Sequence, residues 1–324
     1  MATAEAFLKP EATLGEYLLT WLAHMTGRVR LKTLEGYEAL IHRHAIPVLG
    51  EIPLRELHPL HLQRLYGALM ARGTLAAGTV LNLHLVLTQA LGQAHRWGLI
   101  PTNPAAAAQP PRPRRAEPVV PDAALVTRLL REVQGTWFAV PVTMAIATGM
   151  RRGEVLGLRW SDLDVGLTVA HVRRSLQVVR GELLFAEPKT RRSRRSVPLP
   201  SLVRPLLADH RRDQEARREE AEVWEDHDLV LDRGNGRPVN PGTLSSGWHR
   251  FCRLRGLPPV RFHDLRHGHA TLMLLQGVHP KVVSERLGHA NIGITLDIYS
   301  HVLPTMQAEA VRAFDALFPG AAQG

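Results

Sequence analysis

The sequence contains one cysteine, Cys252, among 324 residues. A single thiol excludes an internal disulfide framework and any zinc site built on paired cysteines, and we expect a small, buried apolar side chain here. The N-terminal residues show no basic segment followed by a long apolar run, so no signal peptide is predicted. The most apolar stretch, residues 137–150, is too short for a membrane span and is typical of a buried helix.

The sequence also lacks the common signatures of enzymes that use nucleotides or metals. It has no Walker-type loop, no Gly-x-Gly-x-x-Gly after a strand and no Gly-x-Ser-x-Gly elbow. Its seventeen histidines are scattered. His263, His267 and His269 form a local cluster that resembles a metal site, but no glutamate accompanies the first two as in His-Glu-x-x-His. We therefore expect neither a metal nor a cofactor.

Lysine is scarce, and the positive charge is carried almost wholly by arginine. The formal net charge is +10 and the isoelectric point is near 10.6. This excess favours a polyanionic partner, either nucleic acid or an anionic membrane surface, although a merely basic protein shows it too. Because no membrane segment is predicted, we expect a cytoplasmic, nucleoid-associated protein that binds DNA.

Apolar periodicity and proline content divide the chain into three parts. Residues 14–97 repeat apolar positions every three or four residues, which predicts four helices in a domain spanning residues 1–100. Breaks between these helices are expected at Pro47 and Gly50, at Pro53 and Pro59, and over residues 73–78. Residues 101–121 contain seven prolines and three arginines, which predicts a semi-rigid linker. Residues 122–324 form the second expected domain, including a C-terminal tail helix.

The second domain is predicted to mix helices with a few strands. Helices are expected over 121–133 and 137–149, followed by a short helix that carries Arg151 and Glu154. Two strands, 167–179 and 182–199, are joined at Arg180-Gly181, with a second turn over 190–193. A solvated helix over 202–224, a hairpin over 228–240 and helices from residue 241 onward complete the prediction, with Gly277 and Gly288 as C-caps.

Two pairs of residues indicate an anion site. Transfer of a phosphodiester without a metal needs cations on the nonbridging oxygens, an acid for the leaving oxygen and a nucleophile in line. Arginine suits the first task because its planar fork binds phosphate bidentately and stays charged. Arg151 follows an apolar helix and has Glu154 one turn on to orient it, and His263 lies one turn before Arg266. Either pair alone is more typical of a surface ion pair or of a histidine with its hydrogen bonds satisfied. Together, in a basic chain, the two pairs are a more specific indication of an anion site.

Lys189 is the candidate general acid. It is the single lysine beside four arginines in the predicted strand pair, and neighbouring positive charge lowers the pKa of a lysine. The alternative is that Lys189 is one more phosphate contact. Lys281, on a helix that is expected to be exposed, is the lesser candidate.

Tyr299 is the candidate nucleophile. The other three tyrosines, Tyr17, Tyr37 and Tyr66, all lie in the N-terminal helices. A lone tyrosine near a C-terminus is more often a packed aromatic, and a phenol needs a positive pocket or a base to attack at neutral pH. The histidines and arginines named above, with His289 of Leu-Gly-His, would supply that pocket.

Five ordered segments resemble the tyrosine recombinases, also called phage-type integrases. They are TGMRRGEVLGLRWSDLD, EPKTRRSRRSVPL, HDLRHGHAT, LGHANIG and LDIYSHV, and they fall within residues 122–302. Residues 14–97 resemble the family's core-binding domain, less specifically. The resemblance implies a mainly α fold with a small antiparallel β-sheet, in which a helical core-binding domain and a mixed α+β catalytic domain form a C-shaped clamp on DNA.

The resemblance also implies a mechanism. Tyr299 would attack a scissile phosphate, giving a 3′-phosphotyrosine link and a free 5′-hydroxyl. The implied roles are transition-state stabilisation by Arg151, Arg266 and His289, protonation of the leaving oxygen by Lys189, and base catalysis toward Tyr299 by His263. Because the covalent bond conserves the phosphodiester's energy, neither ATP nor a metal is required.

Partners follow from the same resemblance. We expect double-stranded DNA recombination sites, a homotetramer in the synaptic complex and, as a further candidate, an accessory directionality factor. An apolar stripe in residues 306–318, formed by Ala310, Phe314 and Leu317, would dock on a neighbouring protomer or pack on its own domain. Arginines of the linker and hairpin are candidate DNA contacts, with solvated charge as the alternative for the linker: Arg112, Arg114, Arg115, Arg191, Arg192, Arg194 and Arg195.

Two features depart from the family pattern. The family often has threonine after His-x-x-Arg-His, where this chain has Gly268, a difference that concerns local helix packing. Only about ten residues precede the first helix, so directionality is controlled without arm sites or the protein is closer to the simpler dimer-resolving recombinases. We predict a site-specific recombinase or integrase of a phage or other mobile element. The alternatives are a chromosome-dimer-resolving recombinase, a type IB topoisomerase, or an inactive DNA-binding relative, which is disfavoured because every catalytic position is filled.

Overall fold

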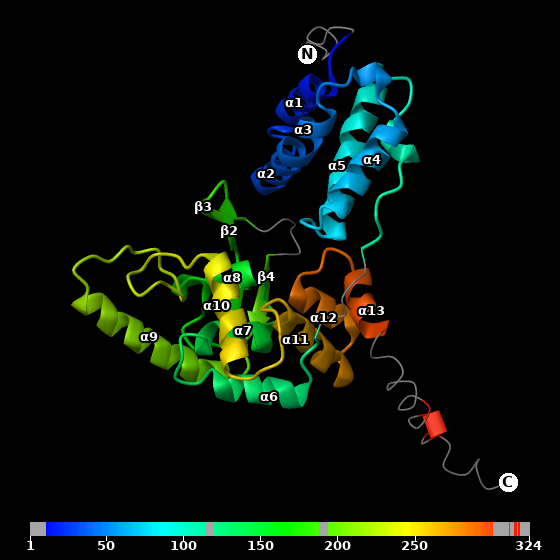
Figure 1. Ribbon diagram of the computed structural model, residues 1–324. Coiled ribbons are helices and arrows are strands. Elements are labelled where there is room, and N and C mark those ends of the chain that lie inside the picture. Colours follow the sequence, from blue (N-terminus) through cyan, green and yellow to red (C-terminus); the bar gives the residue numbers. More distant parts are fainter. Residues whose placement is uncertain are drawn as a thin grey trace, which may run out of the picture. The chain divides into compact units, whose positions relative to one another are not determined.

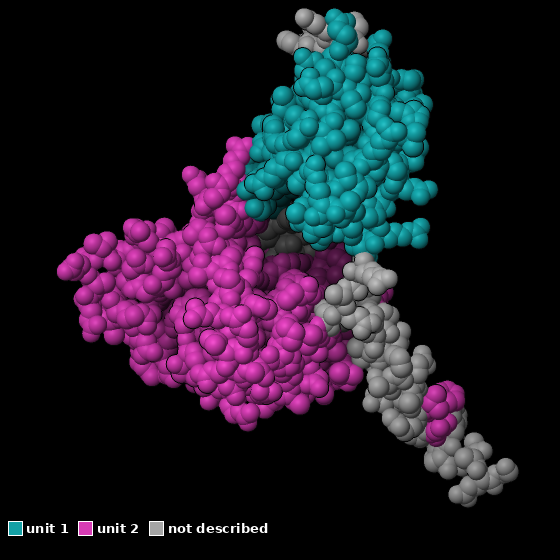
Figure 2. All heavy atoms as spheres, in the orientation of Figure 1, with its two compact units in different colours: residues 1–116 teal, residues 117–324 magenta. Residues whose placement is uncertain are grey.

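The computed structural model describes residues 11–113, 119–187 and 194–300, together with residues 311, 314, 315 and 317; the side chains of residues 297–300 lie outside this description. The chain divides into two compact units, residues 1–116 and 117–324 (Figure 2). Each unit buries a hydrophobic core of its own. None of the described helices combines the length and apolar character that a membrane span requires.

Unit 1 is built from helices (Figure 1). In chain order they are α1 (Leu14–Met25), α2 (Leu31–Leu40), the π-helical turn η2 (Ile41–Ala45), α3 (Ile46–Leu49), η3 (Leu54–Glu56), α4 (Pro59–Ala71), α5 (Ala77–Arg96) and η4 (Pro104–Ala107). Thr13 and Glu16 form a capping box that starts α1. The buried Tyr17 hydroxyl donates to the carbonyl of Ala90 at 2.5 Å and so joins α1 to α5.

Pro47 does not end its helix, contrary to the prediction. The chain stays helical from residue 31 to residue 49 and leaves the helix at Gly50. A proline ring inside a regular helix clashes with the carbonyl four residues before it. Here the wider π turn precedes the proline, and the N–H of Ile46 bonds to the carbonyl of Ile41. Pro47 therefore enters at the start of α3, where a missing donor costs little.

The first part of the expected linker belongs to unit 1. Ala105 and Ala108 are buried in its core, and η4 packs against α4 and α5. Asn103 holds this segment, because its side chain accepts from the N–H of Ala105 and donates to the carbonyl of Thr88, both at 3.0 Å. Small apolar side chains thus dock here in spite of the surrounding prolines.

Unit 2 mixes helices with short strands, as predicted (Figure 1). Its elements are α6 (Ala123–Glu132), α7 (Ala139–Thr148), α8 (Arg152–Leu156), η5 (Trp160–Asp162), β1 (Val169–Val172), β2 (Ser175–Val179), β3 (Glu182–Ala186), β4 (Arg195–Pro198), α9 (Val203–Glu220), α10 (Pro241–Leu254), α11 (Asp264–Leu275), α12 (Pro280–Leu287) and α13 (Gly293–Ser300). Every residue of α7 from Val140 to Thr148 is buried, so the apolar stretch is an internal helix. Cys252 is buried as expected.

The strands form two antiparallel pairs. β2 pairs with β3 across the predicted turn at Arg180-Gly181, where both residues have positive φ. β1 pairs instead with β4. Each of the two expected long strands is therefore divided in two, because its halves pair with different partners. The mainly helical fold with small antiparallel sheets is confirmed.

Candidate active site

Arg151 lies where α7 ends and α8 begins. The helix α7 stops at Gly149, whose φ of 67° is left-handed. A Cβ at Gly149 would overlap Leu287, so only glycine fits. Arg151 then caps α8: its N–H donates to Glu154 Oε2 at 2.9 Å and its Nη1 donates to Oε1 at 2.8 Å. The predicted pairing of Arg151 with Glu154 is present.

One carboxylate, that of Glu154, receives two guanidinium groups. Arg195 donates to Oε2 at 2.8 Å and to Oε1 at 3.2 Å, beside the bonds from Arg151. Burial alone would raise the pKa of Glu154, but the hydrogen bond and charge of Arg195, followed by the charge of Arg151, bring that pKa below its usual value. Glu154 is therefore ionised at neutral pH and orients both arginines.

Arg266 connects the ends of two helices. Its Nη1 donates to the carbonyl of Gly149 at 2.6 Å and its Nη2 to the carbonyl of Leu287 at 2.8 Å. These carbonyls lie at the C-termini of α7 and α12, where the helix dipole favours a cation. The side chain is only 3% exposed, and burial lowers the pKa of Arg266 to about 9, which keeps it protonated at neutral pH.

The start of α11 presents His263. Asp264, which is buried, accepts from the backbone N–H of Arg261 at 2.9 Å and from its guanidinium at 2.7 Å. This pairing holds the turn that leads into the helix. The ring of His263 packs edge-on against that of His267, with centroids 5.0 Å apart.

His289 follows the end of α12. Gly288 terminates this helix with a left-handed φ of 65°, and the N–H of His289 folds back to the carbonyl of Ser284 at 3.0 Å. His289 Nδ1 lies 2.8 Å from the hydroxyl of Thr295 on α13. Both side chains are buried. The predicted C-cap at Gly288 is confirmed.

The histidines of the site are neutral while the arginines are charged. Burial, together with His267 and Arg266, lowers the pKa of His263 to about 4. Burial, Arg266 and Arg151 lower the pKa of His289 to about 3. Beside the Arg261–Asp264 pair and Arg286, the described charges at the site are the guanidinium groups of Arg151, Arg195 and Arg266 and the carboxylate of Glu154, which leaves an excess of positive charge. Such an excess favours an anion as the ligand.

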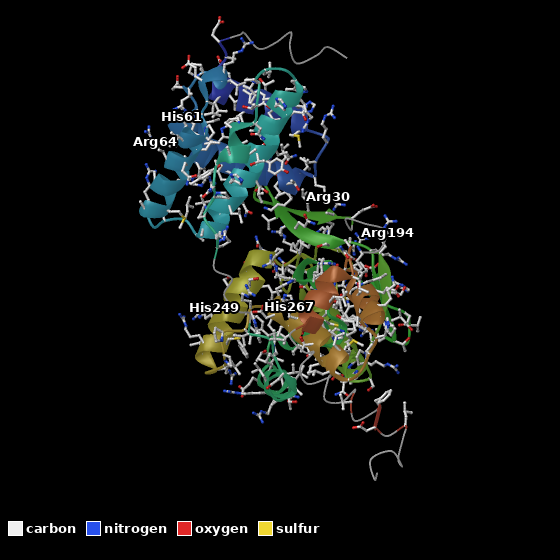
Figure 3. The ribbon with its side chains drawn as sticks, turned by 90° about the vertical axis from the view of Figure 1, so that its right-hand side faces the viewer. Arg30, His61, Arg64, Arg194, His249 and His267 are labelled. Carbon is white, nitrogen blue, oxygen red and sulfur yellow. The ribbon has the colours of Figure 1, made fainter. Side chains whose placement is uncertain are left out.

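The arginines that are predicted to contact DNA differ in exposure and in their partners. Arg194 is exposed beside the strands and pairs with Glu187 at 2.7 Å (Figure 3). Arg195 differs from the expectation, because its side chain is 7% exposed and its guanidinium is bound to Glu154. Arg112 is exposed at the end of unit 1. Outside the described residues lie Arg114, Arg115, Lys189, Arg191, Arg192 and the side chain of Tyr299.

The histidine cluster does not converge on one point. His263 and His267 contact each other, but His269 is engaged elsewhere, with Nδ1 2.8 Å from the carbonyl of Ile146 and Nε2 accepting from Arg286 at 3.1 Å. Within the described ranges, no group of three potential metal ligands is found.

Several residues of interest had not been singled out from the sequence. Thr295 acts through one side-chain hydrogen bond and Arg286 through three, and no spacing rule marks any of them. Exposed cations also lie on unit 1, where Arg30 precedes α2 and Arg64 lies on α4 beside His61 (Figure 3). In the sequence these residues are marked only by their charge, on helices whose other faces are apolar.

Comparison with known proteins identifies the family. Residues 123–306, more than half of the chain, match the phage integrase family, and residues 13–70 match the phage integrase N-terminal SAM-like domain. The chain belongs to the phage integrase family. This integrase is thus a tyrosine site-specific recombinase, a DNA strand-transferring enzyme. The predicted family and activity are confirmed.

Relatives of this integrase extend over nearly its whole length. A XerC-like tyrosine recombinase of Caldanaerobacter subterraneus subsp. tengcongensis is 28% identical over 95% of this chain and 84% of its own. The structure of the Tn1549 transposon integrase with a circular intermediate DNA superposes with a TM-score of 0.79 at 21% identity, covering 93% of this chain and 99% of that one. A lambda integrase tetramer bound to a Holliday junction gives 0.64 at 20% identity, covering 91% and 79%.

Proposed function

We propose that Arg151, Arg266 and His289 bind the scissile phosphate of a recombination site and that Tyr299 attacks it. The observation that carries this proposal is the convergence of three separate elements on the end of α12. Arg266 bonds to the carbonyl of Leu287, Arg151 bonds to that of Gly288 at 3.0 Å, and His289 is the next residue. The donors of both arginines and the histidine ring are thereby held within one small volume.

The nucleophile is proposed from the position of its helix. α13 packs against α11 and α12 and includes residue 299. Thr295, on the same helix, bonds to His289, so the helix that includes residue 299 lies next to the anion site. Attack by the phenolate expels the 5′-hydroxyl and leaves a 3′-phosphotyrosine. A 5′-hydroxyl of the partner duplex later attacks this phosphotyrosine, which releases the tyrosine and rejoins the DNA strand.

Lys189 is proposed as the acid that protonates the leaving oxygen. The segment that contains it connects β3 to β4. Glu187 and Arg194, on its two sides, form an ion pair at 2.7 Å, and Arg195 follows within the site. Arg195, the second described residue after this segment, is thus bound to Glu154 within the site.

His263 is proposed as the base toward Tyr299. Its low pKa keeps the ring neutral and able to accept a proton at pH 7. A base with a pKa of about 4 is weak for a phenol, whose ordinary pKa is near 10. The bound phosphate compensates, because its negative charge raises the pKa of the nearby histidine.

The assembly that carries out strand exchange is proposed to be a homotetramer on two double-stranded DNA sites. The lambda integrase tetramer on a Holliday junction has the same fold and supports this proposal. Phe314 and Leu317 of the predicted docking stripe are 63% and 70% exposed, whereas Ala310 lies outside the described residues. We propose that this stripe docks on a neighbouring protomer and that an accessory directionality factor sets the outcome. The C-shaped clamp stays a prediction.

A covalent trapping experiment tests the proposal. The substrate is a duplex carrying the inverted repeats found in the DNA that flanks the gene, with a nick beside the scissile phosphate, in buffer with EDTA. We expect a covalent adduct with the wild type and with Tyr37→Phe, a control in unit 1, and none with Tyr299→Phe. Adduct formation by Tyr299→Phe would refute the assignment of the nucleophile.

The acid is tested separately. For Lys189→Ala we expect cleavage to slow by roughly 10²–10⁴-fold. A 5′-thiol leaving group needs no protonation, so a substrate containing it should restore most of the rate. Equal losses on both substrates would refute the role of Lys189.

Resolution of chromosome dimers is a second candidate function, favoured by the likeness to the XerC-like recombinase. A plasmid with two directly repeated sites distinguishes the two candidate functions. A chromosome-dimer resolvase converts this plasmid to two circles without any added factor.

A further inference from the structure

Three consecutive carbonyls at the end of α12 each accept a hydrogen bond from a different arginine. Arg195 Nε donates to the carbonyl of Arg286 at 2.6 Å, Arg266 to that of Leu287 and Arg151 to that of Gly288. The last carbonyls of a helix have no partner within it and carry the negative end of its dipole. The end of α12 therefore acts as a template that spaces three guanidinium groups.

The template is itself fixed to its surroundings by the side chain of Arg286. Its Nη2 donates to the carbonyls of Ala147 and Pro198, both at 3.0 Å, and its Nε donates to His269. These contacts join α12 to α7, β4 and α11. Because the ring of His269 also bonds to the carbonyl of Ile146, the template cannot rotate without breaking several hydrogen bonds.

The three arginines differ in exposure. The side chain of Arg151 is 38% exposed, whereas that of Arg195 is 7% exposed and lies behind Glu154. Arg195 bonds both oxygens of Glu154 and the end of α12. Of the two arginines that share Glu154, only Arg151 is therefore open to an incoming DNA phosphate.

We propose that Arg195 is a positioning residue for strand transfer, which keeps Arg151 directed at the scissile phosphate by sharing Glu154 with it. Without Arg195, the buried carboxylate has Arg151 as its main remaining partner and draws the Arg151 guanidinium into a closer pair. Arg151 then presents less charge to the phosphate. This inference rests on the proposed role of Arg151.

The test measures single-turnover adduct formation on the nicked substrate at saturating protein, with the dissociation constant measured separately. We expect Arg195→Met to lower the rate constant by roughly 10–10²-fold, the range expected for misplacement of a group by about 1 Å. The dissociation constant and its salt dependence should not change. Arg212→Met is the matched control, since Arg212 is an exposed arginine of α9 that pairs with Asp209 and has no proposed role in DNA binding, and it should cleave at the wild-type rate.

Two further measurements separate positioning from folding and from direct contact. A methylphosphonate at the scissile position removes the negative charge that Arg151 meets, so Arg195→Met should lose less on this substrate than on the natural one. The double variant Arg195→Met/Glu154→Gln should cleave faster than Arg195→Met, because a neutral amide no longer draws Arg151 away. If Arg195→Met does not fold, Arg195→Lys is measured by the same criteria.

The outcomes distinguish this inference from the proposed function. Equal losses on both substrates, or a wild-type rate in Arg195→Met, overturn the positioning role alone. A shallower salt dependence, by about one phosphate contact, makes Arg195 a direct DNA ligand and also overturns it. Absence of any wild-type adduct, or adduct formation by Tyr299→Phe, instead contradicts the proposed function.

Discussion

The hydroxyl of Thr295 lies 2.8 Å from Nδ1 of His289, and both residues are buried. A neutral histidine can donate to a phosphate oxygen from Nε2 only if its single ring proton is there. Nδ1 must then accept, and the Thr295 hydroxyl is the donor. The pair thus accommodates the tautomer that the proposed mechanism requires.

Removing that hydroxyl should slow cleavage without unfolding the protein. For Thr295→Val we expect a loss of roughly five- to tenfold in the rate of adduct formation, since a buried hydrogen bond contributes about 1 kcal/mol. Thr295→Ser should retain most of the rate. The control is Thr88→Val in unit 1, where a threonine hydroxyl lies 3.4 Å from Nε2 of His84. A wild-type rate of adduct formation in Thr295→Val would show that the Thr295 hydroxyl does not determine the tautomer of His289.

Stability should decrease in mild acid because two buried histidines resist protonation. The pKa of His269 is lowered to about 4 and that of His289 to about 3. An unfolded histidine titrates near 6.5, so between pH 6.5 and these values the unfolded chain binds more protons than the folded one. Stability is therefore complete above pH 6.5 and is lost as the pH falls.

The size of this loss can be measured by urea unfolding at pH 7, 6 and 5. Each of the two buried histidines should contribute up to about 2 kcal/mol of destabilisation by pH 5. His289→Gln should flatten the dependence. Equal stability at pH 7 and pH 5 would contradict neutral, buried histidines.

DNA should raise the pKa of His289. Burial and then the positive charge of Arg266 and Arg151 lower the pKa of this histidine, and a bound phosphate offsets that charge. Proton NMR titration of Tyr299→Phe, free and bound to the repeat duplex, checks this. His210, which bonds to a carbonyl in unit 2, serves as internal reference and should not shift. An unchanged pKa of His289 would place the phosphate elsewhere.

Gly268 is the position where the related enzymes often have threonine. A Cβ there would lie 3.1 Å from the Cδ and the carbonyl oxygen of Pro121, which is tighter than ordinary contact. We expect Gly268→Thr to cost about 1–3 kcal/mol by overpacking. Gly67→Thr on α4 is the control, because nothing lies within 4 Å of its Cβ. Equal unfolding midpoints for the two variants would refute the close packing on Pro121.

Local spacing was sufficient to predict part of the site. Arg151 and Glu154 pair because residues three apart meet in one helical turn, and Gly288 caps α12 because only glycine adopts a left-handed φ without strain. The four main helices of unit 1 follow from apolar periodicity. Such features depend on a few neighbouring residues, and a sequence shows them directly.

The remaining features depend on contacts between distant segments. Arg151 bonds to a carbonyl 137 residues away, and Arg195 to one 91 residues away. A backbone carbonyl is the same at every position, so no side-chain pattern marks these acceptors. For the same reason the sequence does not show that Arg195 bonds to Glu154 and to the end of α12. The π turn before Pro47 leaves no signal either, because it alters hydrogen bonding rather than apolar spacing.

Identification of the modified residue tests the central claim most directly. Adduct from the nicked substrate is digested with nuclease and trypsin, and the nucleotide-bearing peptide is sequenced by mass spectrometry. The account predicts a 3′-linked nucleotide on Tyr299, in the tryptic peptide spanning residues 287–312, where it is the only tyrosine. A nucleotide on any other residue, or one linked through its 5′-phosphate, would contradict the account.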